Sequence, residues 1–196
     1  MTGRRATAAE QLGSEELDLR IGGIRALERA AREVPADHPA VMEMLAAFIR
    51  EHSCPQGPPA DRGGQVRGRP LRPDVQAALT AVGHRLAGRD TGPVDLTRAD
   101  LSGADLSGVN LAGADLSGAR LTGATLIGAD LTGTVLADTD LSGADLTRTD
   151  LTRAELTGAL WPQERPVPAG WTRHTGSGQL IPVDTHAESA ASQPQG

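Results

Sequence analysis

The sequence predicts a β solenoid that is preceded by a small α-helical region, and three observations lead to this fold class. A leucine returns at every fifth position from Leu96 to Leu156 without a break. A glycine stands two residues after most of these leucines. Between residues 14 and 86, in contrast, apolar residues are spaced by three and four positions, as on one face of a helix.

The first expected element is a helix over residues 14–32. Ser14 is a suitable N-cap, and Glu15 and Glu16 suit the positive end of the helix dipole. The glycine pair at 22 and 23 weakens this helix or allows a neighbouring segment to approach closely. The face that we expect to be buried consists of the apolar residues at helical spacing, Leu17, Ile21, Ile24, Leu27 and Ala31.

Two further helices are expected before the repeat. One should run from Pro39 to His52 and the other should begin at Pro73, because proline fits the first helical position. We divide this part of the chain into a helical region (residues 1–54), a disordered linker rich in Pro, Gly and Arg (55–72) and a helix that leads into the repeat (73–90). The expected inward residues are Val41, Leu45, Phe48 and Ile49 on the second helix and Val75, Leu79, Val82 and Leu86 on the third.

The five-residue repeat fits neither regular secondary structure. In an α-helix, a leucine at every fifth position would wind round the whole surface, and in a strand successive leucines would point to opposite faces. All the leucines can point inward only when the chain turns once per repeat, so the chain should form a coil with a leucine core. The expected core ladder is Leu96, Leu101, Leu106, Leu111, Leu116, Leu121, Leu126, Leu131, Leu136, Leu141, Leu146, Leu151, Leu156 and Trp161.

The repeated pattern is A-(D/N)-L-x-x, which reads ADLSG, NLAGA, ADLTG and ADLTR at different places, and it resembles the pentapeptide-repeat family over residues 94–161. The resemblance implies a right-handed quadrilateral β-helix with four repeats per coil, which gives about three coils here. It also implies that the central leucine and the small residue two positions before it face inward. Trp161 should close the end of the tube together with a capping segment at 162–183, before a disordered tail at 184–196.

The stretch DLRIGGIRALERAARE resembles a helix of the HEAT type, a class that serves mainly in protein binding. The chain as a whole resembles a group of uncharacterised bacterial pentapeptide-repeat proteins. The resemblance covers the helical region before the repeat, the repeat itself and the following segment WPQERPVPAGWTRHTGSGQL. Many members of that group carry transmembrane segments before the helical part, and this sequence begins where those segments would end. A small helical cap on the β-helix is the alternative interpretation of the same residues.

The composition argues against an enzyme, and we expect no catalytic site, no metal site and no cofactor. All 19 basic residues are arginines, so a Walker A motif and a Schiff-base lysine are both excluded. His52 and Cys54 are the only pair close enough to suggest a metal, whereas zinc needs three or four ligands. No apolar run reaches the length of about 18 residues that suggests a membrane span. We expect a cytoplasmic bacterial protein.

The function that we expect is a non-enzymatic scaffold, in which a rigid rod and a helical module bind an unidentified protein partner. A homodimer is an open alternative for its assembly, and no direct contact with nucleic acid is expected. The alternative function is a DNA mimic that modulates DNA gyrase, because residues 94–160 contain ten acidic residues and four arginines. The acidic interaction surface would consist of Asp100, Asp105, Asp115, Asp130, Asp140, Asp145 and Asp150.

Overall fold

The structure, a computed structural model, describes residues 2–53 and 71–183, with side chains from residue 6 onward. Leu71 and Arg72 are described, but the rest of the expected linker (55–72), Cys54 and the expected tail (184–196) lie outside the described residues. The α-helices are α1 (Thr2–Leu12), α2 (Leu17–Glu33), α3 (His38–Ser53) and α4 (Pro73–Gly83). Two short 3-10 helices, η1 (Pro35–Asp37) and η2 (Ala87–Arg89), and two strands, β1 (Trp171–Arg173) and β2 (Leu180–Pro182), complete the regular elements.

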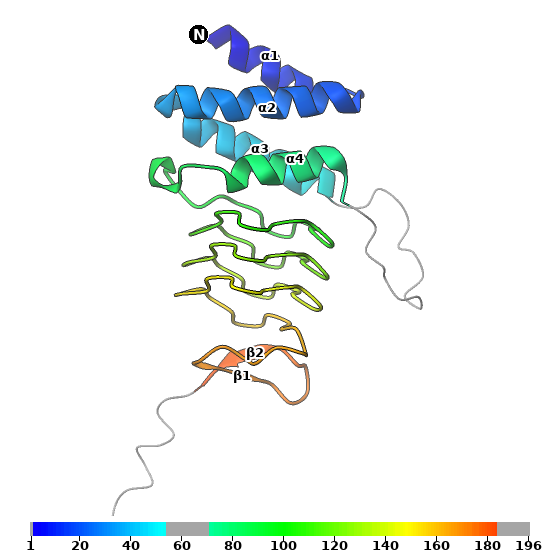
Figure 1. Cartoon of the computed structure of the whole chain (residues 1–196), viewed down its shortest axis with the longest axis vertical. Coiled ribbons are helices and arrows are strands. Elements are labelled where there is room, and N and C mark those ends of the chain that lie inside the picture. Colours follow the sequence, from blue (N-terminus) through cyan, green and yellow to red (C-terminus); the bar gives the residue numbers. More distant parts are fainter. Residues whose placement is uncertain (1, 54–70, 184–196) are drawn as a thin grey trace, which may run out of the picture.

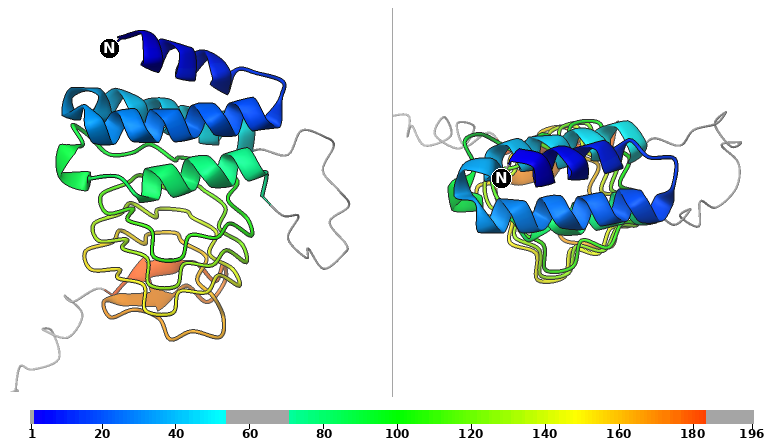
Figure 2. Two further views of the ribbon diagram at one scale, coloured as in Figure 1. Left: turned by 45° about the horizontal axis from the view of Figure 1, so that its top comes forward. Right: turned by 90° about the horizontal axis from the view of Figure 1, so that it is seen from above.

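The helices form layers at one end of a stack of coils (Figures 1 and 2). Helix α1 packs on α2, α2 packs on α3 and α4, and α3 and α4 pack on each other. Figure 1 shows α3 and α4 above the first coil and the β1–β2 hairpin below the last one. The helical region therefore lies on the axis of the rod rather than beside it.

Helix α1 was not expected from the sequence, because it contains few large apolar residues. It buries Ala8 and Leu12 against α2. The close approach depends on Gly23, where an added Cβ atom would lie 2.7 Å from the carbonyl oxygen of Ala8. The glycine pair in α2 therefore allows a neighbouring helix to approach closely.

Helix α2 begins three residues later than predicted. Its N-cap is Glu16, which makes no capping bond, whereas the Ser14 hydroxyl accepts a bond from the Glu16 N–H at 3.1 Å in the preceding turn. The predicted inward position of Leu17 was wrong, because this residue is exposed. The buried face consists of Gly23, Ile24, Leu27 and Ala31, so the first turn of α2 lies outside the packed face.

Helix α4 is shorter than the helix that we predicted up to residue 90, since it ends at Gly83. Beyond this point the chain loses its helical period, and for this reason Leu86 is exposed instead of buried. The other inward residues predicted on α3 and α4 are buried, namely Val41, Leu45, Phe48, Ile49, Val75, Leu79 and Val82.

The repeat forms coils in which each residue lies beside the residue twenty positions further along. Parallel bridges at this spacing begin with Asp95 and Asp115 and end with Asp140 and Leu160. Each bridge is held by backbone bonds in both directions, for example from the Leu116 N–H to the Val135 carbonyl at 2.8 Å and from the Val135 N–H to the Ala114 carbonyl at 2.9 Å. Four repeats therefore make one coil.

A turn follows every leucine, and its second residue takes a left-handed backbone conformation. Most of these positions are glycines, such as Gly113 with φ of 67°. Arg98, Asp138, Arg148 and Arg153 adopt the same conformation with φ between 56° and 60°. Glycine recurs in the repeat because it adopts this conformation without the steric cost that other residues meet.

The inside of the coils is filled by the leucines and by the small residues two positions before them. The ladder leucines are buried, apart from Leu151, which is only half-buried, and Trp161 is also buried. Thr134 and Thr139 occupy small-residue positions, and their hydroxyls donate to the carbonyls of Leu111 and Leu116, each at 2.9 Å. One hydrophobic cluster runs without interruption from Ala8 in α1 to Leu180 in β2, so helices and coils share a single core.

Candidate interaction surfaces

The first coil has no coil above it, and residues of the helices bind its open edge instead. The Asp105 N–H donates to Gln76 Oε1 at 3.0 Å, and Gln76 Nε2 donates to the Asp105 carbonyl at 2.7 Å. The Asp100 N–H donates to the Ser53 hydroxyl at 3.1 Å. The Asn110 N–H donates to the Gly83 carbonyl at 3.0 Å. The helices thus satisfy backbone groups that a preceding coil would otherwise satisfy.

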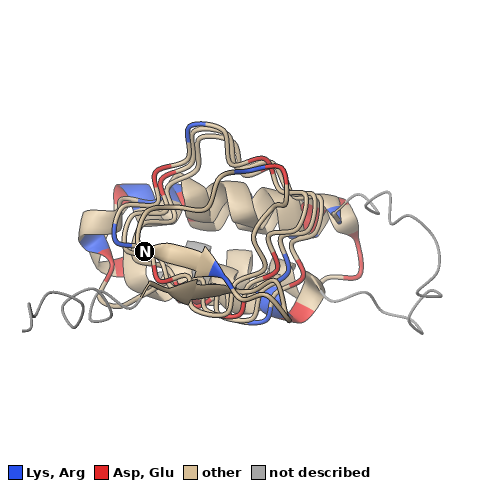
Figure 3. Cartoon of the chain, turned by 90° about the horizontal axis from the view of Figure 1, so that it is seen from below, with Lys and Arg blue, Asp and Glu red and all other residues tan. Residues whose placement is uncertain are grey.

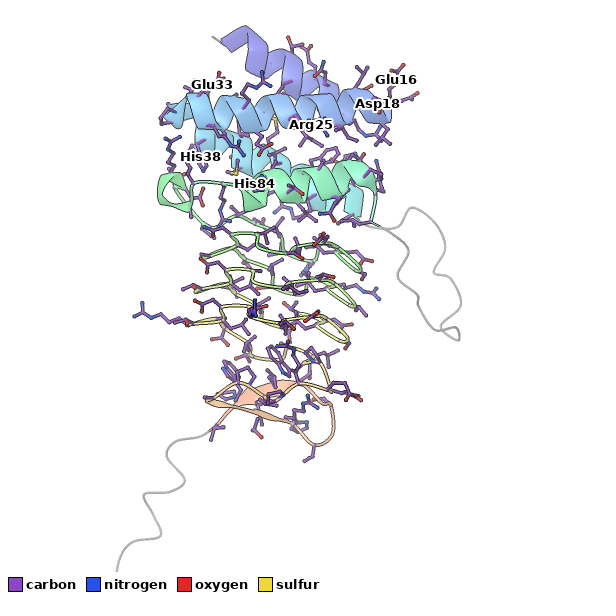
Figure 4. All side chains as sticks on the ribbon, in the orientation of Figure 1. Glu16, Asp18, Arg25, Glu33, His38 and His84 are labelled. Carbon is purple, nitrogen blue, oxygen red and sulfur yellow. The ribbon has the colours of Figure 1, made fainter. Side chains whose placement is uncertain are left out.

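Arg85 forms the most buried of these junctions, with its side chain 1% exposed. Its guanidinium donates to the Asp90 carboxylate at 2.8 Å, to the Ala112 carbonyl at 2.6 Å and to the Asn110 carbonyl. The other Asp90 oxygen lies 2.9 Å from Nε2 of buried His38 at the start of α3. One network therefore joins α3, the segment after α4 and the first coil. Figure 4 labels His38 and His84 near this end of the helices.

A second buried charge joins the helices to one another. The Asp74 carboxylate is fully buried and accepts bonds from Arg20 of α2 at 2.6 Å and from Arg72 at 2.7 Å. Burial opposes ionisation of this group, but the bonds from Arg72 and Arg20 outweigh burial and lower the pKa of Asp74 below its ordinary value of 3.8. Together with the shared core, these contacts make the helices and the coils one body.

The seven aspartates of the predicted acidic surface lie on the outside of the coils, but they form no continuous acidic face. The bridges place Arg120 between Asp100 and Asp140, and Thr125 between Asp105 and Asp145. Asp115 lies between Asp95 and Val135, and Asp130 lies next to Asp150, so two pairs of aspartates stack directly as like charges. Figure 3 shows acidic positions at several places round the coils, with basic positions between them.

All seven of these carboxylates also form part of the turn that follows them. Asp105 Oδ1 accepts bonds from the Ser107 hydroxyl at 2.7 Å and from the Ser107 N–H at 3.1 Å, and these two bonds lower the pKa of Asp105. The same bond to the N–H two residues ahead recurs at Asp100, Asp115, Asp130, Asp140, Asp145 and Asp150. The repeated aspartate therefore has a structural role in each turn, as an Asx-turn residue.

The helical region has a groove between α1 and α2, with a volume of about 820 Å³. Small residues line it, with Ala8 on one side and Gly22, Ala26 and Ala30 on the other. Arg25 and Arg29, one turn apart on α2, border this groove, which we call the α1–α2 groove. Among the described residues, neither arginine has a hydrogen-bond or ion-pair partner, and Figure 4 shows Arg25 and Glu33 on α2. Sequence reasoning missed this groove because it missed α1.

Within residues 2–53 and 71–183, no group of three or more His, Cys, Asp or Glu side chains could hold a metal ion. The predicted weakness of the His52–Cys54 pair as a metal site stays untested, because Cys54 lies outside that part of the chain. His52 stacks on Phe48 with the ring centres 4.2 Å apart, and its Nδ1 lies 3.0 Å from the Phe48 carbonyl oxygen. None of the helices in the described part of the chain has the length and hydropathy needed to cross a membrane.

These coils, with twenty residues per turn and one inward leucine per five residues, define a β-helical repeat protein. A family model described as pentapeptide repeats matches eight copies, at residues 95–133 and 124–160. The chain belongs to this family, as its repeat sequence predicted, and its fold is a β-helix with four repeats per coil and with helices added at the N-terminal end.

Solved structures of the same family resemble parts of the chain. A pentapeptide repeat protein of the Arabidopsis thaliana thylakoid lumen is 34% identical, over 35% of this chain and 47% of that one (TM-score 0.34). HetL from Nostoc sp. strain PCC 7120, a protein involved in regulating heterocyst differentiation, is 39% identical, over 38% of this chain and 41% of that one (TM-score 0.27). Another pentapeptide repeat protein, from Nostoc PCC 7120, is 38% identical, over 43% of this chain and 74% of that one (TM-score 0.26). The chain thus spans less than half of the first two, and curated proteins gave no match.

Proposed function

We propose that this protein is a non-enzymatic scaffold that binds a protein partner at its helical end. In this proposal the β-helix has about three coils, is closed by helices at one end and by the C-terminal segment at the other, and serves as a rigid platform. The cellular setting that we propose is the bacterial cytoplasm. The observation that carries the proposal is the α1–α2 groove, an open concavity on a body whose helices and coils share one core.

The shape and charge of the groove favour a helix as the bound segment. One wall of the groove has only small side chains over more than two turns of α2, at Gly22, Ala26 and Ala30. Such small side chains allow another backbone to approach closely. Arg25 and Arg29 lie at the border with no partner among the described residues. A partner helix with an apolar face and acidic residues one turn apart would complement both features.

The alternative function, a DNA mimic that modulates DNA gyrase, has less support. Such a mimic needs an acidic face that continues along the rod, whereas Arg120, Thr125 and Val135 interrupt three of the four outward columns. The aspartates are also engaged in their own turns. A gyrase-binding role therefore stays the second candidate, and the experiment below includes its outcome.

The test is affinity capture from a bacterial lysate with the full chain as bait, compared with the double variant Arg25→Glu/Arg29→Glu. We expect a specific partner that the unchanged chain retains and the double variant loses. Binding of the purified partner should then weaken with rising salt, because the contact includes charge pairs at a solvated rim.

The matched control is Arg148→Glu/Arg153→Glu, which reverses two exposed arginines on the coils and should retain the partner. Loss of the partner from the control bait but not from the groove variant would contradict binding at the helical end. A different result would favour the DNA-mimic alternative. In that case both double variants would capture gyrase subunits as well as the unchanged chain does, and added salt would release those subunits.

A further inference from the structure

A cavity of about 470 Å³, which we call the α4–coil pocket, lies between α4 and the first coil. Leu71 and Thr80 line it on the helical side, and Asp105, Ser107 and Val109 line it on the side of the coil. Its volume falls within the range of about 300–1,000 Å³ that is typical of small-ligand sites. The chemistry of these lining residues indicates which ligand the pocket fits.

The Ser107 carbonyl is a backbone acceptor for which the described residues provide no donor. Lower in the stack, the carbonyl at this place in the turn accepts a bond from the coil above, as the Ile127 carbonyl does from the Gly108 N–H at 2.8 Å. The first coil has no coil above it, so its carbonyls at this place point toward the helices. Because Ser107 lines the α4–coil pocket, its carbonyl is an open acceptor there.

Other open carbonyls of the coils show which donor suits such a place. In the next turn of the first coil, the Ala112 carbonyl accepts a bond from the Arg85 guanidinium at 2.6 Å. At the opposite end of the stack, the Leu146 carbonyl accepts a bond from Arg165 at 2.9 Å. The chain thus binds carbonyls at both ends of the coils with its own cationic side chains. No arginine of the described residues lines the α4–coil pocket, so a cation there must come from another molecule.

Two further acceptors line the pocket. Asp105 Oδ1 is occupied by the Ser107 hydroxyl and N–H, whereas no group in the described part of the chain bonds to Asp105 Oδ2. The Thr80 hydroxyl donates to the Gln76 carbonyl at 2.9 Å, so its oxygen keeps a lone pair for another donor. The pocket therefore offers three acceptors, one of which carries a negative charge.

The rest of the lining suits an aliphatic stem. Leu71 and Val109 provide apolar surface, and His84 is already paired with a carboxylate, since its Nδ1 lies 3.2 Å from Glu28 Oε1. A lysine ammonium has three donors and no acceptor, and its methylene chain packs on apolar surface while the charged group binds polar atoms. A primary ammonium on such a stem matches the acceptors, the charge and the apolar walls together.

We propose that the α4–coil pocket binds a primary ammonium group on an alkyl stem, with the Ser107 carbonyl, the Thr80 hydroxyl and the Asp105 carboxylate as its acceptors. A lysine side chain of another protein and a free alkylamine share this chemistry. The inference concerns a different site from the α1–α2 groove and does not depend on the proposed function.

The test is an NMR titration of the full chain with Nα-acetyl-lysine N-methylamide and, separately, with 1,5-diaminopentane. We expect saturable shifts of the Ser107 and Gly108 amides with a Kd of about 1–10 mM, as befits one small group in one pocket. The Nε-acetylated form of the lysine derivative has no charge and should bind about fivefold more weakly or less. Tighter binding of the lysine derivative would identify a protein lysine as the ligand, and tighter binding of the diamine a free alkylamine.

Asp105→Asn removes the charge but keeps the turn, because Asn110 forms the same turn with a bond of 3.0 Å from the Ala112 N–H. It should weaken binding of the lysine derivative by about fivefold. The matched control is Asp130→Asn, which changes an aspartate with the same role in a turn outside the pocket and should leave binding unchanged. The spectrum of each variant also shows whether it is folded.

Three results would overturn the proposal. The first is the absence of saturable shifts at Ser107 and Gly108 with either amine. The second is equal binding of the lysine derivative and its Nε-acetylated form, which would mean that the pocket does not recognise the ammonium group. The third is an affinity that Asp105→Asn leaves unchanged or that Asp130→Asn lowers as much.

Discussion

Gln76 on α4 and Asp105 on the first coil are bonded to each other as two neighbouring strand residues are. The Gln76 amide donates to the Asp105 carbonyl at 2.7 Å and accepts from the Asp105 N–H at 3.0 Å. One side chain thus replaces the two backbone groups that a preceding coil would provide. This contact illustrates how a β-helix can begin directly beneath a layer of helices without an unpaired edge.

The first prediction concerns this contact. Gln76→Ala removes both bonds, and we expect the free energy of unfolding to fall by about 1–2 kcal/mol, since the freed groups are partly reached by water. Gln163→Ala is the control, because its side chain is exposed and has no bond in the described structure; its effect should stay within about 0.5 kcal/mol. Chemical denaturation followed by circular dichroism measures both. Equal effects of the two substitutions would mean that Gln76 does not support the edge.

The second prediction concerns Arg85. Arg85→Met keeps much of the side-chain volume but leaves the Asp90 carboxylate and the Asn110 and Ala112 carbonyls without their buried donor. We expect a loss of about 3 kcal/mol or more in unfolding free energy, as for other broken buried ion pairs. Arg89→Met is the control, since Arg89 makes only bonds of 3.3 and 3.4 Å to carbonyls of α2. A loss as small as that of the control would contradict a role for Arg85 at the junction.

The third prediction concerns the contact between Gly83 and Val109. An alanine at position 83 would place its Cβ 2.7 Å from both the Cβ and the Cγ1 of Val109, so Gly83→Ala should destabilise the protein by about 1–3 kcal/mol. In the double variant Gly83→Ala/Val109→Gly, the second substitution removes both of these Val109 atoms, and the two losses should therefore be less than additive. Gly88→Ala is the control, because no atom lies within 4 Å of its added Cβ. Strict additivity would show that the two residues do not limit the approach of α4 to the coil.

The fourth prediction concerns pH. The pKa of Asp74 is lowered in the folded protein. At pH values between this lowered pKa and the ordinary value of 3.8, the folded state therefore keeps the carboxylate charged, whereas the unfolded chain binds a proton there. Its contribution to stability is present above the ordinary Asp value of 3.8 and is lost as the pH falls through the lowered pKa. Asp74→Asn should therefore destabilise the protein at neutral pH by about 2–3 kcal/mol. The difference in unfolding free energy between the unchanged chain and this variant should become smaller in acid.

Unfolding free energies of the unchanged chain and of Asp74→Asn, measured between neutral pH and the acid limit of folding, check this. The difference between the two curves isolates Asp74 from the other aspartates with lowered pKa, such as Asp105 and Asp145. A difference that stays constant through the acid range would contradict the assignment.

The repeat could be predicted in detail because each of its positions has a local cause. Glycine follows the leucine where the backbone is left-handed, and aspartate precedes it where its carboxylate binds the turn two residues ahead. Arg120 stacks between Asp100 and Asp140 because the three residues are twenty positions apart, which is the length of one coil. The helices were less predictable, since Leu17 and Leu86 carry the expected spacing but lie outside the packed faces.

The sequence by itself determined the coil, because a five-residue period can bury all its leucines in only one way. It also determined that residues 38–53 and 73–83 are helical, although not where every helix begins and ends. Only the tertiary structure decided that α1 exists as a partner of α2 and that the helices bind the first coil through Ser53, Gln76 and Arg85. Those contacts join residues that lie far apart in the sequence. They depend on which edge is left unpaired once the coils have formed, and this is a property of the assembled backbone rather than of any local pattern.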